Sequence, residues 1–405
     1  MAMLKYCLDC EELETVHWQH WIDAFFQLFI PEKLSVPYRI DQTLSAFVLN
    51  ITTALRLGHF SDSYALNDLS PRLAYFIEAA RKRGLVCQVL KISNRYTEHL
   101  KIMYRGKSYY FQSYPTASNF DGPLAWITGN KARTKKYLRE RGFPVAPGKE
   151  YYFWQKERAI IESIAAIGFP LVVKPLRGTF GRHITTNIQT ENELRKAIQH
   201  AIEYQPRFII EQYVDTGPVY RISVVDFKYI ACVQYSDVEV RGDGTSSITT
   251  LIQKKNADPL RRVDSWKYPL FWPVLVSNET DTLLKEQGFA YDSIPMIGTR
   301  VKLQRTPFLR WGADLIDRTD EMHPHNKELV ENVMRNFNMH VGGIDVIMED
   351  IKRPWNEQRC AILEINNLPC IDMHHVPTVG NVRDVASPIV NLFLKYYTIP
   401  SLAKP

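Results

Sequence analysis

Two short apolar runs near the C-terminal end carry polar side chains at regular intervals. The first is Gly342-Gly343-Ile344-Asp345-Val346, and the second is Ala361-Ile362-Leu363-Glu364-Ile365-Asn366-Asn367. Each is typical of a buried strand, and the alternation of a strand places Glu364 and Asn366 on the same face. Two carboxylates and an amide oxygen are the hard ligands that Mg²⁺ prefers. The runs therefore predict a magnesium site formed by Asp345, Glu364 and Asn366, the alternative being core strands with acids at their rims.

An upstream run, residues 169–175, favours the metal interpretation. It is apolar enough for a buried strand and ends with Lys174, a point charge suited to phosphate oxygens. The segment that follows contains Arg177, Gly178, Gly181 and Arg182. The two glycines let backbone N–H groups approach an anion, and the two arginines offer forked donors. No Gly-Lys-Ser/Thr follows the glycines, so this is not a P-loop. The segment and the ligand strands together predict a site that handles phosphate.

The elements from residue 130 onward alternate between helix and strand without a repeat. A strand over 207–214 ends in polar residues that can present backbone groups to an adenine edge. The predicted helices cover residues 132–141, 157–167, 191–204 (with Thr190 as its cap), 326–337 and 382–396, and a strand pair covers 221–236. This mixture predicts an α+β core of two lobes with a nucleotide in the cleft between them.

The N-terminal third of the sequence is predicted to form helices and strands that precede the two-lobed core. Amphipathic helices are predicted over residues 11–30 and 43–57, then a helix over 71–84 and strands over 85–90, 101–104 and 108–111. We expect four parts: an N-terminal helical segment (1–60), an α/β domain (61–127), a small lobe (128–214) and a large lobe with the metal site (215–405).

The order and spacing of these motifs resemble the ATP-grasp ligases, in particular the ATP-grasp domain of cyanophycin synthetases and of bifunctional glutathione synthetases. The likeness covers about two-thirds of the chain. The segments that carry it are Gly129-Asn130-Lys131, Thr134-Lys135, the run to Lys174 with its glycine-rich loop, Glu211-Gln212-Tyr213, Arg241-Gly242-Asp243-Gly244, Asn256-Ala257-Asp258-Pro259, Asp292-Ser293-Ile294-Pro295, His323-Pro324, Gly343-Ile344-Asp345-Val346, Glu364-Ile365-Asn366 and Met373-His374.

The resemblance implies an ATP-grasp fold, preceded by the small α/β domain, and a role for each matching residue. It implies that Lys135 and Lys174 contact the ATP phosphates and that the segment from Arg177 to Arg182 closes over them. It implies that Glu211 and Tyr213 recognise adenine, next to Val214 and Asp215. Two Mg²⁺ ions would be held by Asp345, Glu364 and Asn366. Arg300 and Arg305 are the candidates for stabilising an acyl phosphate.

The chain also departs from the family pattern. Val219 replaces the acidic residue that usually holds the ribose, and His183 stands where a loop glycine is common. Arg310-Trp311-Gly312-Ala313 replaces a Ser-Thr-Gly-Gly run near the substrate. Arg310 can pair with a substrate carboxylate, and Trp311 can narrow the site. Further candidate substrate residues are Trp266, from an aromatic-rich stretch, and His374. We expect ATP chemistry with a different choice of substrate.

The implied activity is ATP-dependent joining of a carboxylate to an amine through an acyl phosphate, releasing ADP and phosphate. The substrates would be amino acids, short peptides or small carboxylates. A polymerase of the cyanophycin type is not expected, because the additional C-terminal domain of those enzymes has no counterpart in the chain. One alternative is a ligase like glutathione synthetase. Another is a nucleotide-binding regulatory protein without catalysis, which the intact metal and phosphate residues argue against.

Composition narrows the partners. The net charge of +6, without a basic stripe, favours anionic substrates and argues against nucleic acid. No secretory signal and no apolar run of about 18 residues is present, which predicts a cytoplasmic protein without a membrane span. Cys7 and Cys10 form a C-x-x-C, but no second pair follows at zinc-finger spacing, so free thiols are expected. A homo-oligomer (dimer or tetramer) is expected by analogy with the family.

Overall fold

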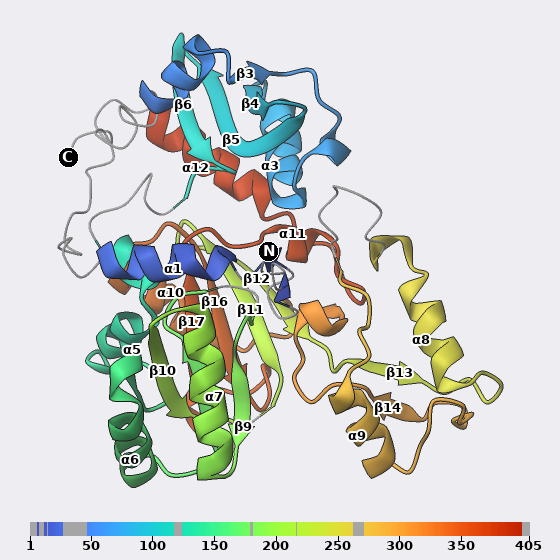
Figure 1. The fold of residues 1–405 in the computed structure, drawn as a ribbon. Coiled ribbons are helices and arrows are strands. Elements are labelled where there is room, and N and C mark those ends of the chain that lie inside the picture. Colours follow the sequence, from blue (N-terminus) through green and yellow to red (C-terminus); the bar gives the residue numbers. More distant parts are fainter. Residues whose placement is uncertain are drawn as a thin grey trace, which may run out of the picture.

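Figure 1 shows the computed structural model. It describes residues 6–7, 12–13, 15–26, 47–116, 124–178, 181–215, 217–261 and 271–398. These residues form an N-terminal α/β domain, a small lobe, a central sheet and a side unit to the right of the sheet in the view. The two-lobed α+β architecture predicted from the sequence is confirmed. Within the described residues, no helix is both long and apolar enough to cross a membrane.

The N-terminal domain is an antiparallel sheet covered by helices. Its strands β3 (Gly58–Ser61), β4 (Val86–Ile92), β5 (Arg95–Tyr104) and β6 (Lys107–Gln112) lie in chain order. Between β3 and β4 come the short helix η1 (Leu66–Asp68) and the helix α3 (Pro71–Lys82). Pro71 is at the first helical position of α3, where a missing N–H costs nothing.

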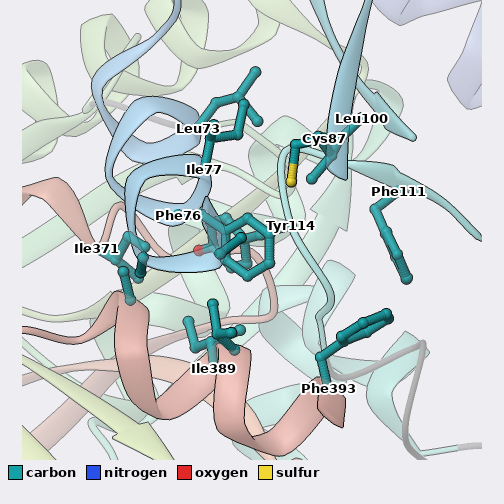
Figure 2. Packing of buried hydrophobic residues seen from close by; sticks show 14 of the residues in the cluster. Leu73, Phe76, Ile77, Cys87, Leu100, Phe111, Tyr114, Ile371, Ile389 and Phe393 are labelled. Carbon is teal, nitrogen blue, oxygen red and sulfur yellow. The ribbon is translucent and has the colours of Figure 1, made fainter. Parts of the chain in front are cut away.

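The last described helix, α12 (Ala386–Thr398), packs in the core of this domain, and that core also includes Val225, Ala231 and Val341 of the central sheet. Figure 2 shows Ile389 and Phe393 of α12 facing Phe76 of α3 and Phe111 of β6. The Phe393 ring lies edge-on to the rings of three residues of the sheet, Tyr104, Tyr109 and Phe111, at 5.8–5.9 Å between centroids. The last described helix of the predicted large lobe, 215–405, thus also contributes to the core of the N-terminal domain.

We expect Ile389→Val to destabilise the protein by about 0.5–1.5 kcal/mol, because it removes one methyl group from a closed core. Ile389 is fully buried in α12. The matched control is Ile161→Val on helix α6 (Lys156–Ala166), where the side chain is 68% exposed, and we expect no measurable change there. Urea unfolding of both variants checks this. Equal losses would contradict the packing of α12 on the N-terminal sheet.

The small lobe is a four-stranded sheet with two helices on one side. Its strands β7 (Gly148–Tyr152), β8 (Leu171–Pro175), β9 (Thr185–Ile188) and β10 (Arg207–Gln212) are arranged in the order β7-β10-β8-β9. The helices α6 (Lys156–Ala166) and α7 (Glu191–Tyr204) pack on it. The predicted cap of α7 is confirmed, because the Thr190 hydroxyl accepts from the Glu193 N–H at 3.3 Å.

The N-terminal segment lies against the small lobe. Strands β1 (Tyr6–Cys7) and β2 (Glu12–Leu13) pair, and helix α1 (Thr15–Phe26) follows and contacts α7 (Figure 1). Trp21 of α1 packs on the core of the lobe and lies 5.1 Å from the Phe153 ring, centroid to centroid. Residues 47–54 are also helical. Both predicted N-terminal helices are thus present, in part.

The central sheet has the order β15-β12-β11-β16-β17, with every pair antiparallel. Its strands are β11 (Val219–Val225), β12 (Tyr229–Tyr235), β15 (Leu315–Asp317), β16 (Val341–Met348) and β17 (Cys360–Asn366). Helix α10 (Pro324–Phe337) packs on one face, and the short helix α11 (Asp372–His375) follows β17. The other face carries Arg221, Asp345 and Glu364, which line a large cleft.

The side unit has its own hydrophobic core, which includes Val238, Leu251, Val274, Val301 and Ala313. It consists of the pair β13 (Glu239–Arg241) and β14 (Arg300–Lys302) with helices α8 (Ile248–Asn256) and α9 (Asn278–Glu286). The sequence prediction did not separate this unit from the large lobe. Chain order does not reveal that residues 237–313 leave the central sheet after β12 and return to it at β15.

Candidate active site

A cleft of about 1630 Å³ lies between the small lobe, the central sheet and the side unit, and residues 70–72 and Glu98 of the N-terminal domain also line it. A pocket for one small ligand usually measures about 300–1,000 Å³, so this cleft has room for more than one. The predicted site residues that line it are Lys174, Gly181, Arg182, Glu211, Tyr213, Val214, Asp215, Arg300, Arg305, Arg310, Asp345, Glu364 and Asn366.

Three charged residues stand side by side across the central sheet. Arg221 of β11 pairs in register with Asp345 of β16, and Asp345 pairs in register with Glu364 of β17. Directly opposite residues have Cβ atoms about 4.5–5.5 Å apart, so the three side chains form one row on the cleft face. Asn366 lies two residues further along β17, opposite Gly343, while Ile365, between them, is buried on the other face. The predicted alternation of β17 is confirmed.

Arg221 holds the Asp345 carboxylate from one side. The Arg221 Nε donates to Asp345 Oδ1, and the Arg221 Nη2 donates to Asp345 Oδ2 at 2.8 Å. Burial raises the pKa of Asp345, and the two hydrogen bonds from Arg221 oppose that shift. Sequence reasoning missed Arg221, because its contact with Asp345 spans 124 residues and depends on strand register.

The oxygens of Asp345, Glu364 and Asn366 fit a magnesium ion. Each carboxylate oxygen has two lone pairs, so an oxygen that accepts from Arg221 can still bind a cation. The Glu364 side chain is 30% exposed towards the cleft. Mg²⁺ binds few protein oxygens and completes its shell with phosphate and water, which an open wall of this kind allows.

The opposite wall carries two lysines joined by one buried carboxylate. Glu211 Oε1 lies 2.7 Å from Lys135 Nζ, and Glu211 Oε2 lies 2.6 Å from Lys174 Nζ. Lys174 and Glu211 come from neighbouring strands, β8 and β10, and Lys135 comes from helix α5 (Lys131–Arg139). All three are buried. This triad carries a net positive charge of one.

The charges of the triad shift its pKa values. Burial alone would raise the pKa of Glu211, but the two lysine charges outweigh it and lower that pKa. Burial lowers the pKa of Lys135 to about 8, and Glu211 only partly opposes this. The Glu211 side chain, predicted to contact adenine, therefore also holds the two lysines in place.

Lys131 joins the two walls and was not among the predicted site residues. It lies one helical turn before Lys135 on α5, so both side chains share one face. Its Nζ lies 3.3 Å from Glu364 Oε1 and donates to the Gly178 carbonyl at 2.9 Å. The i, i+4 spacing of the two lysines was the signal in the sequence that could have found it.

The glycine-rich segment approaches other parts of the molecule closely. A Cβ on Gly181 would lie 3.3 Å from the ring of Phe308 in the side unit, and a Cβ on Gly178 would lie 3.3 Å from the Tyr204 ring. Both glycines have positive φ, 142° for Gly178 and 72° for Gly181. Arg177 and Gly178 do not line the cleft, whereas Gly181 and Arg182 do. The middle of the segment, residues 179–180, is outside the described residues.

The two arginines predicted to stabilise an acyl phosphate lie on the side unit. Arg300 pairs with Glu239 at 2.7 Å and with Asp237 at 3.2 Å. The Arg305 Nη2 donates to the two carboxylate oxygens of Glu286 at 2.6 and 2.7 Å. Both line the cleft with half-exposed side chains that are engaged by neighbouring acids. By contrast, Arg221 donates to the carboxylate of Asp345, one of the predicted metal ligands.

Among the candidate substrate residues, Arg310 lines the cleft, whereas Trp311 and His374 do not. Arg310 lines the cleft, is buried and has its guanidinium 5.6 Å from the Trp311 ring centroid. Trp311 packs against the side unit's core instead of lining the cleft. His374 is fully buried, and its Nε2 lies 2.8 Å from the Ser223 hydroxyl. Trp311 and His374 are therefore not among the residues that line the cleft. Trp266 is outside the described residues.

Comparison with known proteins agrees with this arrangement. The family model described as "D-ala D-ala ligase C-terminus" matches residues 140–246, which run from before β7 to just past β13. Cyanophycin synthetase of Synechocystis sp. is 34% identical over 294 residues, covering 71% of this chain and 33% of that protein. The glutathione biosynthesis bifunctional protein of Pasteurella multocida is 30% identical over 363 residues, covering 87% of this chain and 46% of that protein.

A solved structure shares the fold. The crystal structure of a bifunctional glutathione synthetase from Pasteurella multocida superimposes with a TM-score of 0.61 at 25% identity, covering 82% of this chain and 44% of that chain. This chain thus spans about a third to under a half of the length of these relatives. The sequence matches, the shared fold and the residues gathered in the cleft together show that the chain belongs to the ATP-grasp family.

Proposed function

We propose that this protein is an ATP-dependent carboxylate–amine ligase that forms a peptide or isopeptide bond through an acyl phosphate. The observation that carries the proposal is the gathering of both halves of a nucleotide site in one cleft. Lys131 and Lys174 line one wall, and Asp345, Glu364 and Asn366 line the other. The relatives named above are ligases of this kind, and their names support the activity for this chain.

Under this proposal the lysines bind the ATP phosphates. Lys174 lines the cleft directly, while Lys135 stands behind it and shares Glu211 with it. Glu211 fixes both ammonium groups before the nucleotide arrives, so little reorganisation is needed in the transition state. Tyr213, Val214 and Asp215 follow β10 at the junction of the lobes and line the cleft, where they would hold adenine and ribose.

Asp345, Glu364 and Asn366 would hold magnesium, which supplies charge neutralisation to the β- and γ-phosphates when it is bound. Arg221 keeps the Asp345 carboxylate in position from the neighbouring strand. Lys131 does the same for Glu364 and also holds the Gly178 carbonyl of the phosphate loop.

The reaction has two balanced steps. A substrate carboxylate oxygen attacks the γ-phosphorus, the bond from that phosphorus to the β-bridging oxygen breaks, and ADP leaves. The amine then attacks the acyl carbon, loses a proton and displaces inorganic phosphate. Arg310 lines the cleft, where it would pair with a substrate carboxylate. Walls from all four parts of the molecule would limit the access of water to the acyl phosphate.

The test is phosphate release from ATP and Mg²⁺ across amino acids, dipeptides and small carboxylates, singly and in pairs. We expect release to require one particular pair and the product mass to equal the two substrates less water. A γ-glutamyl dipeptide with glycine is included, since several relatives make glutathione by name. ATP binding without turnover on any pair would favour the non-catalytic alternative. The cytoplasmic location, the homo-oligomer and the exclusion of nucleic-acid partners stay predictions.

ATP affinity should weaken as pH rises through about 8. Burial lowers the pKa of Lys135 to about 8 in the free protein, so it is charged below that pH and neutral above it. A neutral lysine does not attract phosphate. The plot of log Kd for ATP against pH should therefore bend near pH 8, staying level below that pH and rising by up to about tenfold in Kd per pH unit above it. Isothermal titration between pH about 6.5 and about 9.5 measures this.

The control for this prediction is Lys136→Arg, an exposed neighbour on the same helix, which should keep the bend near 8. Lys135→Arg should remove the bend, since an arginine stays charged throughout this range. A wild-type profile without a bend would show that Lys135 has no part in phosphate binding.

A further inference from the structure

A second cluster of ligand-type side chains lies outside the cleft, where the N-terminal segment meets the small lobe. Cys7 of β1, His17 of α1 and His183, two residues before β9, bring one ligand atom each within 4.8 Å of one another. Both histidines are buried and Cys7 is partly buried. The ATP chemistry proposed above uses none of the three.

The spacing of the atoms suits a tetrahedral metal. Cys7 Sγ lies 3.4 Å from His183 Nε2. A zinc ion with a Zn–S bond of about 2.3 Å and a Zn–N bond of about 2.0–2.1 Å places its tetrahedral sulfur and nitrogen ligands about 3.5 Å apart. The third atom, on His17, lies within 4.8 Å of the other two, and the His17 ring lies 5.1 Å from the His183 ring at 84°, centroid to centroid. The edge-on arrangement lets both rings point a nitrogen at one centre.

His183 is held in the form that binds a metal. Its Nδ1 lies 2.7 Å from the His200 carbonyl oxygen. A carbonyl only accepts, so Nδ1 carries the proton, and in neutral imidazole the lone pair is then on Nε2, which faces Cys7. Histidines that bind metals almost always donate their other N–H to a carbonyl or carboxylate in this way.

His183 also has an unusual backbone. Its φ is +52°, a conformation that glycine adopts readily and that other residues rarely adopt. The residue in this conformation is a histidine, and it directly follows Gly181 and Arg182, which line the cleft. A residue held in such a conformation suggests a function for its side chain.

We propose that Cys7, His17 and His183 bind one Zn²⁺ ion that fastens the N-terminal segment to the base of the phosphate loop. Zn²⁺ prefers this mixture of thiolate and imidazole, and binding releases the Cys7 proton. The ion would join β1, α1 and the start of β9, which are 176 residues apart along the chain at their extremes. The ordinary alternative is a hydrogen bond from the Cys7 thiol to His183 with no metal.

The test is metal binding by the full-length protein. Protein purified without chelator should contain zinc at about one ion per chain. After removal of that zinc, Co²⁺ should produce a sulfur-to-cobalt charge-transfer band that saturates at one equivalent. Cys7→Ser, His17→Gln and His183→Gln should each weaken Zn²⁺ binding about 100-fold or more, since even residues that only support metal ligands cost about 10–100-fold. Neither readout requires ATP turnover, so the outcome is independent of the proposed activity.

Matched controls are Cys360→Ser, a partly buried cysteine on β17, and His59→Gln, an exposed histidine on β3. Both should bind Zn²⁺ as the wild type does. If the wild-type protein contains no zinc and shows no cobalt charge-transfer band, the proposal is wrong, and the contact between Cys7 and His183 is an ordinary hydrogen bond. A band that survives Cys7→Ser but is lost in Cys10→Ser would also overturn the assignment of Cys7. The wild-type measurements hold even if a variant fails to fold.

Discussion

Glu364→Gln is expected to reduce ATP turnover by at least about 10²–10³-fold while leaving the protein folded, the size of effect seen when one electrostatic contact to a developing charge is removed. The substitution keeps the shape of the side chain and removes its charge. Glu364 stands opposite Asp345 and 3.3 Å from Lys131, on the wall proposed to hold magnesium. Phosphate release at saturating ATP measures the effect.

The matched control is Glu328→Gln, an exposed glutamate on helix α10, which should keep full activity. Thermal melting of both variants establishes that the fold survives. Because Mg²⁺ needs the carboxylate charge, raising its concentration should recover only part of the activity of Glu364→Gln. Full activity in that variant at ordinary Mg²⁺ would show that the metal assignment is wrong.

Glu211→Gln is expected to produce the largest loss of stability, about 3–5 kcal/mol, the usual cost of removing one partner from a buried ion pair. Glu211 neutralises one of two buried ammonium groups, and its two oxygens lie 2.7 and 2.6 Å from them. Without its charge, Lys135 and Lys174 repel each other in a site where water cannot screen them. Urea unfolding at pH about 7 measures the change.

Two comparisons separate this electrostatic cause from a general effect of the substitution. Glu162→Gln removes a glutamate that also pairs with two cations, Lys149 and Arg158, but on the surface, so the loss should be much smaller. Adding Lys135→Met to Glu211→Gln should recover stability, since it removes one of the two repelling charges. Equal losses at Glu162 and Glu211, or no recovery in the double variant, would contradict the explanation.

The central sheet shows where sequence reasoning succeeds and where it stops. The alternation along 360–366 correctly placed Glu364 and Asn366 on one face and Ile365 in the core. The contact between Arg221 and Asp345 could not be predicted in the same way. Alternation tells which face of a strand a residue occupies, but only the register between strands tells which residues are opposite.

Contacts between distant residues in the cleft and at Cys7 also could not be predicted from the sequence. The sequence indicated Lys135, Lys174 and Glu211 as nucleotide residues, but not that the glutamate lies between the two lysines. The C-x-x-C at Cys7 predicted only free thiols, because the two histidines that meet Cys7 follow it by 10 and by 176 residues. Close contacts between distant residues leave no fixed spacing in a sequence.

The sequence by itself determined the local structure: helix α7 with its Thr190 cap, the strands that carry the polar residues, and which face of each is buried. Only the tertiary structure decided what covers those faces. The periodicity of α12 predicts an apolar stripe, and the same stripe would fit any apolar surface. It packs on the N-terminal sheet, in a core that also includes Val225, Ala231 and Val341 of the central sheet, because burial of apolar area is non-directional and the partner depends on how the whole chain is arranged.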